Sequence, residues 1–363
     1  MKSIEISRND YCQFLTLSPQ NYSITYFAEH AQRCSHDVIN RFLQRDKYSP
    51  SMLWEHVKGD VVFSEDGYVI FDDTVLEKRN TKKIEIARNQ YSGAKGKVTT
   101  GIGVVSLVYY NPEIDRYWVI DYRIYQPDQD GKSKIDHLLD MLNNAIYSKN
   151  IPFSTVLFDT WYATHKIMAH IDSLNKIYYA PLKANRNVTK VNSDEKYQHV
   201  STLFMADYEK KNGTLIHVKG FPKDMDVTLF QFTISTNRVD YIVTNDKIQK
   251  TSQTVQDVYS MRWVTENMHR EIKQLTGIEK CQCRKQRIQR NHIACSFLVW
   301  AFLKRTAHKT TMIEFCGKSG INIFSSQVLN TSVSTLALTM PHPISESPDK
   351  PDITFVRPFA FQS

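Results

Sequence analysis

The stretch VYSMRWVTENMHREIKQL, residues 258–275, has two opposed faces when it is wound as an α-helix. At about 100° per residue, its polar side chains fall within roughly 80° of one another on one side. The apolar side chains fall on the opposite side, which is the pattern of a helix that packs on a core. The polar face holds Tyr259, Arg262, Glu266, Arg270 and Lys273, and the apolar face holds Met261, Val264, Met268, Ile272 and Leu275.

The polar face of this helix has two interpretations. Arg262 with Glu266, and Glu266 with Arg270, have the i, i+4 spacing of ordinary ion pairs on a solvated surface. The face nevertheless holds three cations and one carboxylate, so it does not neutralise itself. It also follows two acidic strand ends in the chain, which favours a functional site over a solvated surface.

Two acidic positions upstream end short apolar runs that are typical of buried strands. The run YVIFDD ends in Asp72 and Asp73, and the run TVLFD ends in Asp159. Neighbouring strand residues point to opposite faces, so only one of the first pair can face a given site. A carboxylate just past a strand lies at the carboxyl end of a sheet, where open α/β sheets usually carry their sites. For Asp159 the alternative is a helix N-cap, because a helix is predicted to follow it. Other aspartates, Asp121 among them, are predicted to lie in turns or on the surface.

The spacing Y-x2-R-x3-E-x6-K resembles the YREK signature of bacterial insertion-sequence DDE transposases of the insertion-sequence 4-like family. The resemblance covers about residues 60–310. It implies a ribonuclease-H-like core whose glutamate lies on a helix that follows a β-rich insertion. The first aspartate of the family is usually followed by threonine, so the resemblance favours Asp73, which precedes Thr74, over Asp72. The signature is formed here by Tyr259, Arg262, Glu266 and Lys273.

The resemblance implies a DNA transposase that cuts at the ends of its insertion sequence and joins them to target DNA. Asp73, Asp159 and Glu266 are then both the catalytic residues and the metal ligands. Attack on a phosphodiester adds charge to an anion, and two divalent cations about 4 Å apart stabilise the entering and leaving oxygens. Mg²⁺, with Mn²⁺ as a substitute, suits carboxylate ligands, so no histidine or cysteine cluster is required. Cys281-x-Cys283 lacks the spacing of a zinc site and is predicted to be structural.

DNA-binding residues are predicted on the signature face and just beyond it. By resemblance, Tyr259, Arg262 and Lys273 hold phosphates of the transposon end, and Arg270 shares their face. Residues 280–309 contain eight Lys and Arg and no Asp or Glu, which is typical of phosphate contacts along DNA. A membrane-surface helix has a similar pattern. The further contacts predicted in this segment are Arg284, Lys285, Arg287 and Arg290.

The predicted partners are double-stranded DNA and a second copy of the chain. The DNA comprises the terminal inverted repeats of the transposon and the target, and the resemblance implies a homodimer in the DNA complex. No membrane partner is expected.

The chain as a whole is predicted to be an α/β protein with a ribonuclease-H-like mixed sheet and flanking helices. From residue 68, strand-like runs and helices follow the order β-β-β-α-β-α-β. A long helical region is expected over residues 254–308. Helices at residues 24–31 and 37–44 resemble a helix-turn-helix, although any small helical bundle gives the same pattern. The predicted parts are a helical N-terminal DNA-binding region (1–60), the first part of the core (61–183), a mainly β insertion (184–237), the remainder of the core (238–310) and a tail (311–363).

Composition and charge favour a nucleic-acid-binding protein of the cytoplasm. The formal net charge of +8 and the pI of about 9.0 suit a polyanionic partner. The sequence shows no apolar N-terminal signal and no apolar run long enough to span a bilayer. Its six cysteines form no framework pattern and predict reduced thiols. These features predict a location in the bacterial cytoplasm, associated with the nucleoid.

Two aspects of the reaction stay open at the level of sequence. Some members of the family cleave through a DNA hairpin, with a flipped base stacked on an aromatic residue of the β insertion. That insertion has no tryptophan here, and Trp161 and Trp263 are candidates either for stacking or for core packing. Two alternative functions remain. The first is a nuclease of the same fold that does not transfer strands, and the second is an inactivated transposase that acts as a DNA-binding regulator. A strand-transfer assay separates the first alternative, and metal-independent binding without cleavage identifies the second.

Overall fold

The computed structural model describes residues 6–18, 21–31, 34–78, 83–193, 196–235, 238–248 and 250–309. The predicted tail, residues 311–363, therefore lies outside the described residues.

The chain divides into two compact units. The first, here called the sheet unit, comprises Val61–Thr74 and Val104–Met268. The second, here called the helical unit, comprises Met1–Asp60, Val75–Gly103 and His269–Ser363. The division falls within β1 (Tyr68–Glu77), β3 (Lys97–Asn111) and α10 (Trp263–Thr276), so each of these elements contributes residues to both units.

Five strands form the ribonuclease-H-like part of the sheet unit. Their spatial order is β4-β3-β1-β5-β6. β1 is therefore central, with β3 and β4 on one side of it and β5 and β6 on the other. β5 pairs parallel with β1 and with β6, whereas β3 and β4 pair antiparallel. This is the strand order of the ribonuclease-H-like fold, and it confirms the predicted α/β class. The bounds of the remaining strands are Arg116–Ile124 for β4, Thr155–Phe158 for β5 and Ile177–Leu182 for β6.

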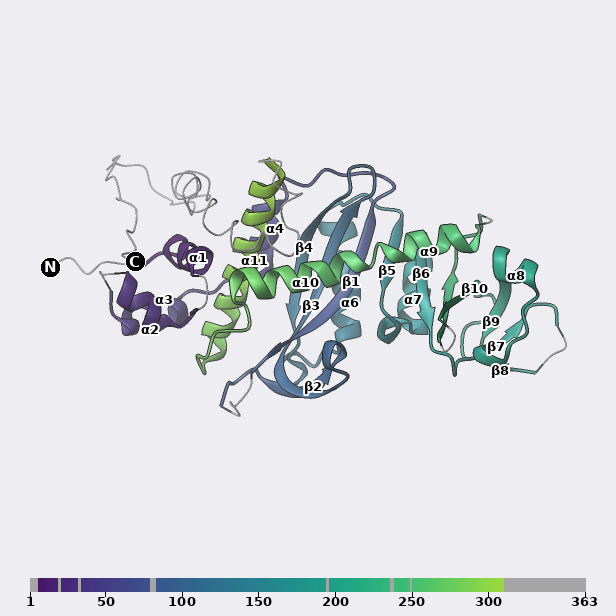
Figure 1. Cartoon of the computed structure of the whole chain (residues 1–363), viewed down its shortest axis with the longest axis horizontal. Coiled ribbons are helices and arrows are strands. Elements are labelled where there is room, and N and C mark those ends of the chain that lie inside the picture. The colour runs from purple at the N-terminus through teal and green to yellow at the C-terminus, as the bar shows by residue number, and fades with distance from the viewer. Residues whose placement is uncertain are drawn as a thin grey trace. The chain divides into compact units, whose positions relative to one another are not determined.

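Helices flank this sheet, and each presents an apolar stripe to it. α6 (Lys134–Asn143) starts at a capping box formed by Ser133 and Asp136, and it ends in a π-helical turn, Asn144–Ser148. α7 (His165–Ser173) follows β5 and packs on β6. In Figure 1, α10 passes in front of β1, and α6 is partly hidden behind the strands. The side chains that α6 and α7 bury are Leu138, Met141, Leu142, Ile167, Met168 and Ile171.

A mainly β insertion continues the same sheet beyond β6. β11 pairs antiparallel with β6, and the order then runs β11-β10-β9-β7-β8. A 3-10 turn, Val200–Thr202, and a short helix, α8 (Asp207–Asn212), interrupt these strands. The predicted β insertion before the glutamate-bearing helix is therefore present. The strand bounds are Asn187–Lys190 for β7, Gln198–His199 for β8, Thr214–Val218 for β9, Asp226–Ser235 for β10 and Arg238–Thr244 for β11.

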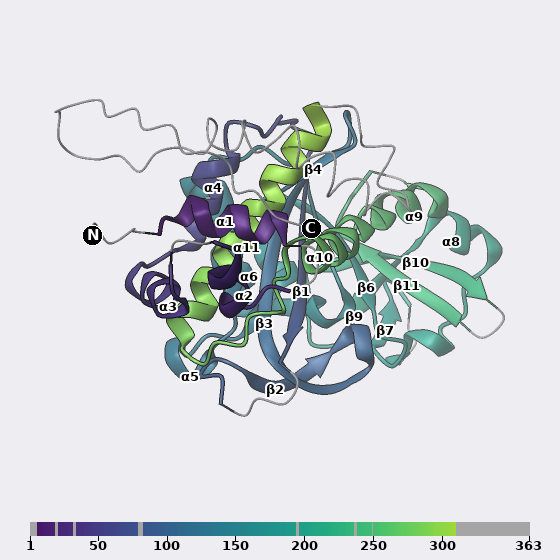
Figure 2. The same ribbon diagram turned by 60° about the vertical axis from the view of Figure 1, so that its left-hand side comes forward.

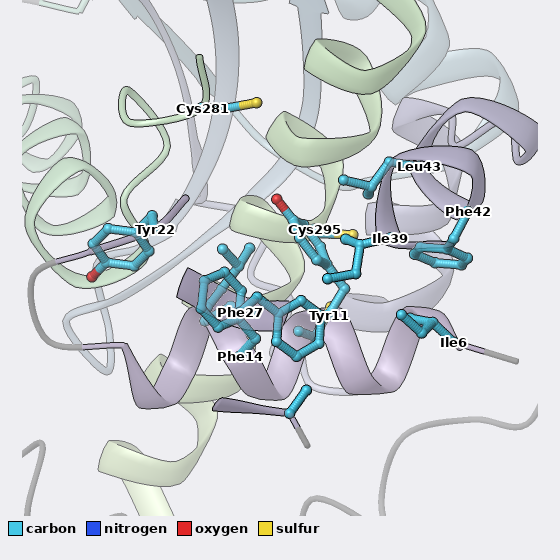
Figure 3. Packing of buried hydrophobic residues seen from close by; sticks show 14 of the residues in the cluster. Ile6, Tyr11, Phe14, Tyr22, Phe27, Ile39, Phe42, Leu43, Cys281 and Cys295 are labelled. Atoms are coloured by element: carbon cyan, nitrogen blue, oxygen red, sulfur yellow. The ribbon is translucent and has the colours of Figure 1, made fainter. Parts of the chain in front are cut away.

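The helical unit is organised around α11 (Gln286–Lys309), which α1, α3 and α4 contact (Figure 2). Phe14 and Phe27 stack in its core with ring centroids 4.5 Å apart, beside Tyr11 (Figure 3). The Tyr11 hydroxyl lies 2.8 Å from Nδ1 of His292, and both side chains are fully buried. The predicted helical N-terminal region is thus observed. Its helices are α1 (Arg8–Leu17), α2 (Ile24–His30), α3 (His36–Arg45) and α4 (Pro50–Val57).

Gly277 ends α10 within the helical unit. Its φ of +60° lies in the left-handed region that L side chains rarely adopt. A Cβ atom at this position would lie 2.4 Å from the ring of Tyr22. Both the backbone conformation and the close approach therefore require glycine here.

The helical region expected over residues 254–308 is present as three helices, namely α9 (Ser252–Ser260), α10 and α11. A short strand that the sequence did not suggest, β2 (Arg88–Ser92), pairs with the start of β3. Asp121 is not a surface residue, because it is only 2% exposed and lies within 3.0 Å of the Lys149 ammonium. No helix among the described residues has the length and apolar character needed to cross a membrane.

Candidate active site

The four acidic side chains singled out from the sequence all belong to the sheet unit. Asp72 and Asp73 lie on β1, just past the residues that pair with β5. Asp159 directly follows β5 and precedes a short 3-10 helix, Thr160–Tyr162. Its side chain makes no capping hydrogen bond, so the N-cap alternative does not describe it. Glu266 lies in the first turn of α10.

Asp73 points to the side of the sheet that carries α6 and the turn after β5. Its Oδ1 accepts a hydrogen bond of 2.7 Å from the hydroxyl of Tyr162, and its Oδ2 lies 2.5 Å from Nζ of Lys134. Burial, followed by the charge of Asp73, holds the pKa of Tyr162 well above its ordinary value, so this hydroxyl stays a donor. Since Tyr162 lies three residues after Asp159, its side chain connects Asp73 on β1 with the segment that follows β5.

Asp72 points to the opposite side, toward α10. Its Oδ2 accepts a hydrogen bond of 3.0 Å from Oγ1 of Thr265, the residue before Glu266. Its Oδ1 accepts a bond of 2.8 Å from the amide of Asp73. Burial raises the pKa of Asp72 to about 7, although the nearby Arg262 guanidinium acts in the other direction. The expected alternation of the two aspartates is therefore observed, and Asp72 attaches β1 to the glutamate-bearing helix.

Arg262 lies at the centre of the acidic groups. Its Nη2 is 3.0 Å from Oε1 of Glu266, and its Nη1 is 4.0 Å from Oδ2 of Asp72. Burial lowers the pKa of its guanidinium, but Tyr259, Asp159 and the two bonded carboxylates outweigh burial, so that the pKa is raised overall. The charge of Asp159 thus reaches the same guanidinium. The Arg262–Glu266 ion pair suggested by the spacing is present, and it forms inside a cluster rather than on an open surface.

Rings flank this cluster. The Arg262 guanidinium carbon is 5.7 Å from the ring centroids of both Tyr259 and Trp263. Lys134 has its ammonium 5.8 Å from the ring centroid of Trp161. Trp161 and Trp263 are 52% and 57% exposed, so core packing does not account for either ring.

The donor set fits a hard divalent cation in its chemistry. Asp72, Asp73, Asp159 and Glu266 supply only carboxylate oxygens, which are the ligands that Mg²⁺ prefers. Over the part of the chain that the structure describes, however, no three acidic, histidine or cysteine side chains surround a common point as metal ligands do. In the arrangement observed, cationic side chains engage three of the carboxylates: Lys134 binds Asp73, and Arg262 binds Glu266 and lies near Asp72.

The continuous helix predicted from Tyr259 to Lys273 is interrupted. Tyr259 belongs to α9, and Arg262 lies in a turn whose amides bond three residues back instead of four. The buried side of α10 is formed by Thr265, Met268, His269, Ile272 and Thr276. Of the predicted apolar face, Met268 and Ile272 are buried, whereas Met261, Val264 and Leu275 are partly exposed.

The remaining predicted DNA contacts lie in the helical unit. Lys273 has its ammonium 3.0 Å from Oε1 of Glu279, so it is ion-paired. Lys285 is ion-paired with Glu85 at 2.9 Å. Arg270, Arg284 and Lys285 are exposed, whereas Arg287 and Arg290, in the first turns of α11, are half-buried. The thiols of Cys281 and Cys283 are both free.

Sequence reasoning did not identify Lys134, Tyr162 and Thr265 as members of the site. Tyr162 could have been found from its place in the DTWY segment after the strand. Lys134 opens α6 next to its cap residue, and no local pattern connects it with Asp73. Thr265 lies on the buried side of α10 together with Met268 and Ile272, and a polar side chain on such a face is a recognisable sign of a buried polar contact.

Comparison with known proteins was made on sequence and on structure. Residues 64–302 match the protein family described as Transposase DDE domain. No curated protein matches the chain in sequence. Among solved structures, a synaptic complex of the piggyBac transposase with hairpin DNA is similar at 8% identity and a TM-score of 0.47, over 95% of this chain and 77% of that one. A strand transfer complex of the Drosophila P element transposase is similar at 11% identity and a TM-score of 0.27, over 48% of this chain and 37% of that one.

Both structural similarities are too distant to support an argument about this chain. The sequence match, in contrast, spans more than half of the 363 residues and contains Asp73, Asp159 and Glu266. The chain therefore belongs to the Transposase DDE domain family and is a DNA transposase of the DDE class.

Proposed function

We propose that the chain is a bacterial insertion-sequence transposase of the YREK group, in the insertion-sequence 4-like family. The spacing of Tyr259, Arg262, Glu266 and Lys273 supports this group. The observation that supports the proposal is a chain of contacts: Arg262 binds Glu266 and is influenced by the charge of Asp159, and Tyr162, three residues after Asp159, donates to Asp73.

Asp73, Asp159 and Glu266 are the proposed catalytic residues and metal ligands. Asp73 is preferred to Asp72 because the first aspartate of the family is usually followed by threonine, and Thr74 follows Asp73. A carboxyl whose pKa is about 7 is also a less permanent anion at neutral pH. Two Mg²⁺ ions, or Mn²⁺ in their place, would supply the positive charge that stabilises the entering and leaving oxygens of a phosphodiester.

The reaction proceeds in two displacements at phosphorus. Water first attacks the phosphodiester at the transposon end, and the bond to the 3′ oxygen breaks to leave a free 3′-OH. That hydroxyl then attacks a phosphodiester of the target, which forms the new strand junction and releases a target 3′-OH. Arg262 binds phosphate oxygens in both displacements, since a guanidinium is suited to two such oxygens at once. Tyr259 lies against it and restricts its position.

The DNA partners proposed are the terminal inverted repeats and the target duplex, held by a homodimer. Besides Tyr259 and Arg262, the contacts are Lys273 and Arg270 on α10 and Arg284, Lys285, Arg287 and Arg290 at the start of α11. All act on phosphates, so their contribution should be sensitive to salt and insensitive to base sequence. The proposed location is the bacterial cytoplasm, at the nucleoid. Residues 1–60 are proposed as a further DNA-binding region.

A cleavage and strand-transfer assay tests this function. The substrate is a duplex that carries the inverted repeats flanking the gene, with Mg²⁺ and a supercoiled target. The wild type should nick the repeat end and join it to the target. Glu266→Gln should bind the same duplex with unchanged affinity but lose on the order of a thousand-fold in cleavage rate, as expected when several kcal/mol of stabilisation are removed. Glu65→Gln makes the same chemical change at an exposed position and should leave cleavage intact. Normal cleavage by Glu266→Gln would remove that residue from the mechanism, and nicking without joining would indicate a nuclease.

A further inference from the structure

We propose that the hairpin formed by β2 and the start of β3 inserts an aromatic and an aliphatic side chain into the minor groove of the transposon-end duplex. The proposal rests on the proposed function and adds to it a DNA contact that lies far from the signature helix in the sequence. The hairpin, defined here as residues 88–101, belongs to the helical unit. Its two strands are joined by a 3-10 turn, Gly93–Lys95.

The hairpin is held at its root and along one face. Gly101 packs so closely on β1 that a Cβ atom there would lie 2.5 Å from the carbonyl oxygen of Leu76. Nearer the turn, Thr99 and Lys95 both bind the carboxylate of Glu77, which is also on β1. The ribbon therefore has a fixed direction before DNA binds, which reduces the conformational entropy that is lost on binding.

The opposite face of the hairpin carries an exposed pair of side chains. Tyr91 and Val98 are direct cross-strand partners, so their side chains lie side by side on one face. They are 59% and 65% exposed. The next pair on this face is Asn89 and Thr100, whose side chains bond to each other over 2.6 Å. A ring and a branched aliphatic side chain that project together from an edge hairpin indicate an interaction surface.

The charge of the hairpin indicates that the partner is an anion. Its three charged residues, Arg88, Lys95 and Lys97, are all cations. Lys97 is exposed and makes no ion pair within the described part of the chain. A second copy of the hairpin would bring like charges together, which disfavours pairing between copies. Proteins that bind the minor groove, in contrast, combine cations with apolar side chains that enter between base steps.

The hairpin continues the surface of proposed phosphate contacts at the start of α11. The amide of Glu85, three residues before β2, donates to the carbonyl of Arg284 over 3.0 Å. The Glu85 carboxylate binds the ammonium of Lys285 at 2.9 Å and the amide of Gln286 at 2.8 Å. The segment that leads into β2 is thus attached to residues that are proposed to hold DNA, within the same unit. A duplex that contacts Arg284 therefore passes beside the root of the hairpin.

The dimensions and chemistry of the hairpin suit the minor groove. Five residue pairs join β2 to β3, and at about 3.3 Å per residue they extend the ribbon by roughly 13 Å. The minor groove is only about 7.5 Å deep. Tyr91 and Val98 offer ring and hydrocarbon surface instead of the amide and guanidinium groups that read base edges in the major groove. Insertion of such side chains unstacks a base step and bends the duplex, so the ligand inferred here is a bent duplex.

A duplex that carries the inverted repeat, with a fluorescent donor and acceptor at its two ends, tests this contact. Binding and energy transfer are measured in EDTA, so that cleavage plays no part. The wild type should increase energy transfer, because bending brings the ends of the duplex closer. Tyr91→Ala should bind about ten-fold more weakly, as expected for loss of one buried apolar side chain, and should give less energy transfer at saturation. Lys97→Gln should reduce the slope of log K against log salt by about 0.9 and leave the bend intact.

Matched variants keep the result interpretable. Tyr91→Phe retains the ring and should retain both the affinity and the bend. Tyr147→Ala removes a ring that is 68% exposed and lies outside the hairpin, and it should change neither quantity. Val98→Ala shortens the other member of the pair and should reduce the bend even if Tyr91→Ala fails to fold.

The outcomes separate this contact from the proposed function. A wild type that does not bind or bend the duplex, or a Tyr91→Ala variant that bends it as the wild type does, overturns the contact whatever the cleavage assay shows. A changed oligomeric state of Tyr91→Ala with unaltered DNA binding also overturns it, because the face would then bind a second copy of the chain. Failure of the wild type to cleave, while bending still depends on Tyr91, overturns the proposed reaction and leaves the contact standing.

Discussion

Asp72→Asn should stabilise the protein increasingly as the pH rises. The carboxyl is 14% exposed, and burial raises its pKa from 3.8 to about 7 in the folded state. A group that holds its proton more tightly when folded costs stability once that proton is lost. Wild-type stability should therefore fall between about pH 4 and pH 7 from this group and change little outside that range. One pH unit corresponds to about 1.4 kcal/mol, so the full effect is at most about 4 kcal/mol.

The asparagine variant removes the titration and keeps most of the geometry. Its amide oxygen can accept only one of the two bonds now made by Thr265 and the Asp73 amide, which costs about 1 kcal/mol at every pH. Loss of attraction to Arg262 also counts against the variant, but the direction of the pKa change shows that burial outweighs it. The difference in unfolding free energy between variant and wild type should thus grow by up to about 4 kcal/mol from pH 4 to pH 8.

Urea unfolding followed by tryptophan fluorescence, in EDTA, measures this difference. Asp66→Asn, at an exposed position of the same unit, serves as the control and should show no such growth. A difference between Asp72→Asn and wild type that is the same at pH 4 and pH 8 would refute the reasoning, since it would mean that Asp72 titrates alike in the folded and unfolded chain.

Three further predictions concern the helical unit and its contact with DNA. Gly277→Ala should lower the unfolding free energy by more than about 1 kcal/mol, because alanine would have to adopt a left-handed φ and would clash with Tyr22. Gly59→Ala is the control, since a Cβ atom there has open space and should be nearly neutral. Equal effects of the two substitutions in urea unfolding would contradict this. Tyr11→Phe should cost about 1–3 kcal/mol because it leaves a buried histidine nitrogen without its hydroxyl partner, and an unchanged melting temperature would show that the bond contributes nothing. Arg284→Gln should weaken duplex binding and reduce the slope of log K against log salt by about 0.9, the share of one phosphate contact, and an unaltered slope would exclude this residue from the interface.

The elements that local pattern decides were predictable. The apolar run before Asp159 predicted the end of β5 correctly, whereas β1 continues past Asp73 to Glu77. Alternation predicted that Asp72 and Asp73 would diverge, as their contacts show. The order of strands and helices from residue 68 followed from the same patterns, and so did the β insertion.

The features that were missed depend on contacts remote in sequence. No proline or glycine marks the break between α9 and α10 in the sequence. The break lies at Arg262, whose guanidinium binds Glu266. β2 is a polar edge strand, RNQYS, that only its pairing with β3 defines. Asp121 is buried and ion-paired with Arg123 and with Lys149, which lies 28 residues further along the chain. Each of these residues looks unremarkable beside its neighbours in the chain.

The ion pair between Arg262 and Glu266 can make cleavage depend on bound DNA in the proposed mechanism. While the guanidinium of Arg262 binds the carboxylate of Glu266, it competes with any cation for that oxygen. In the proposed mechanism, a strand that draws Arg262 away frees the acidic ligands, so DNA and Mg²⁺ each increase the affinity for the other by the same factor. That mechanism therefore predicts that the protein without DNA binds divalent cations weakly, and that bound DNA strengthens this binding.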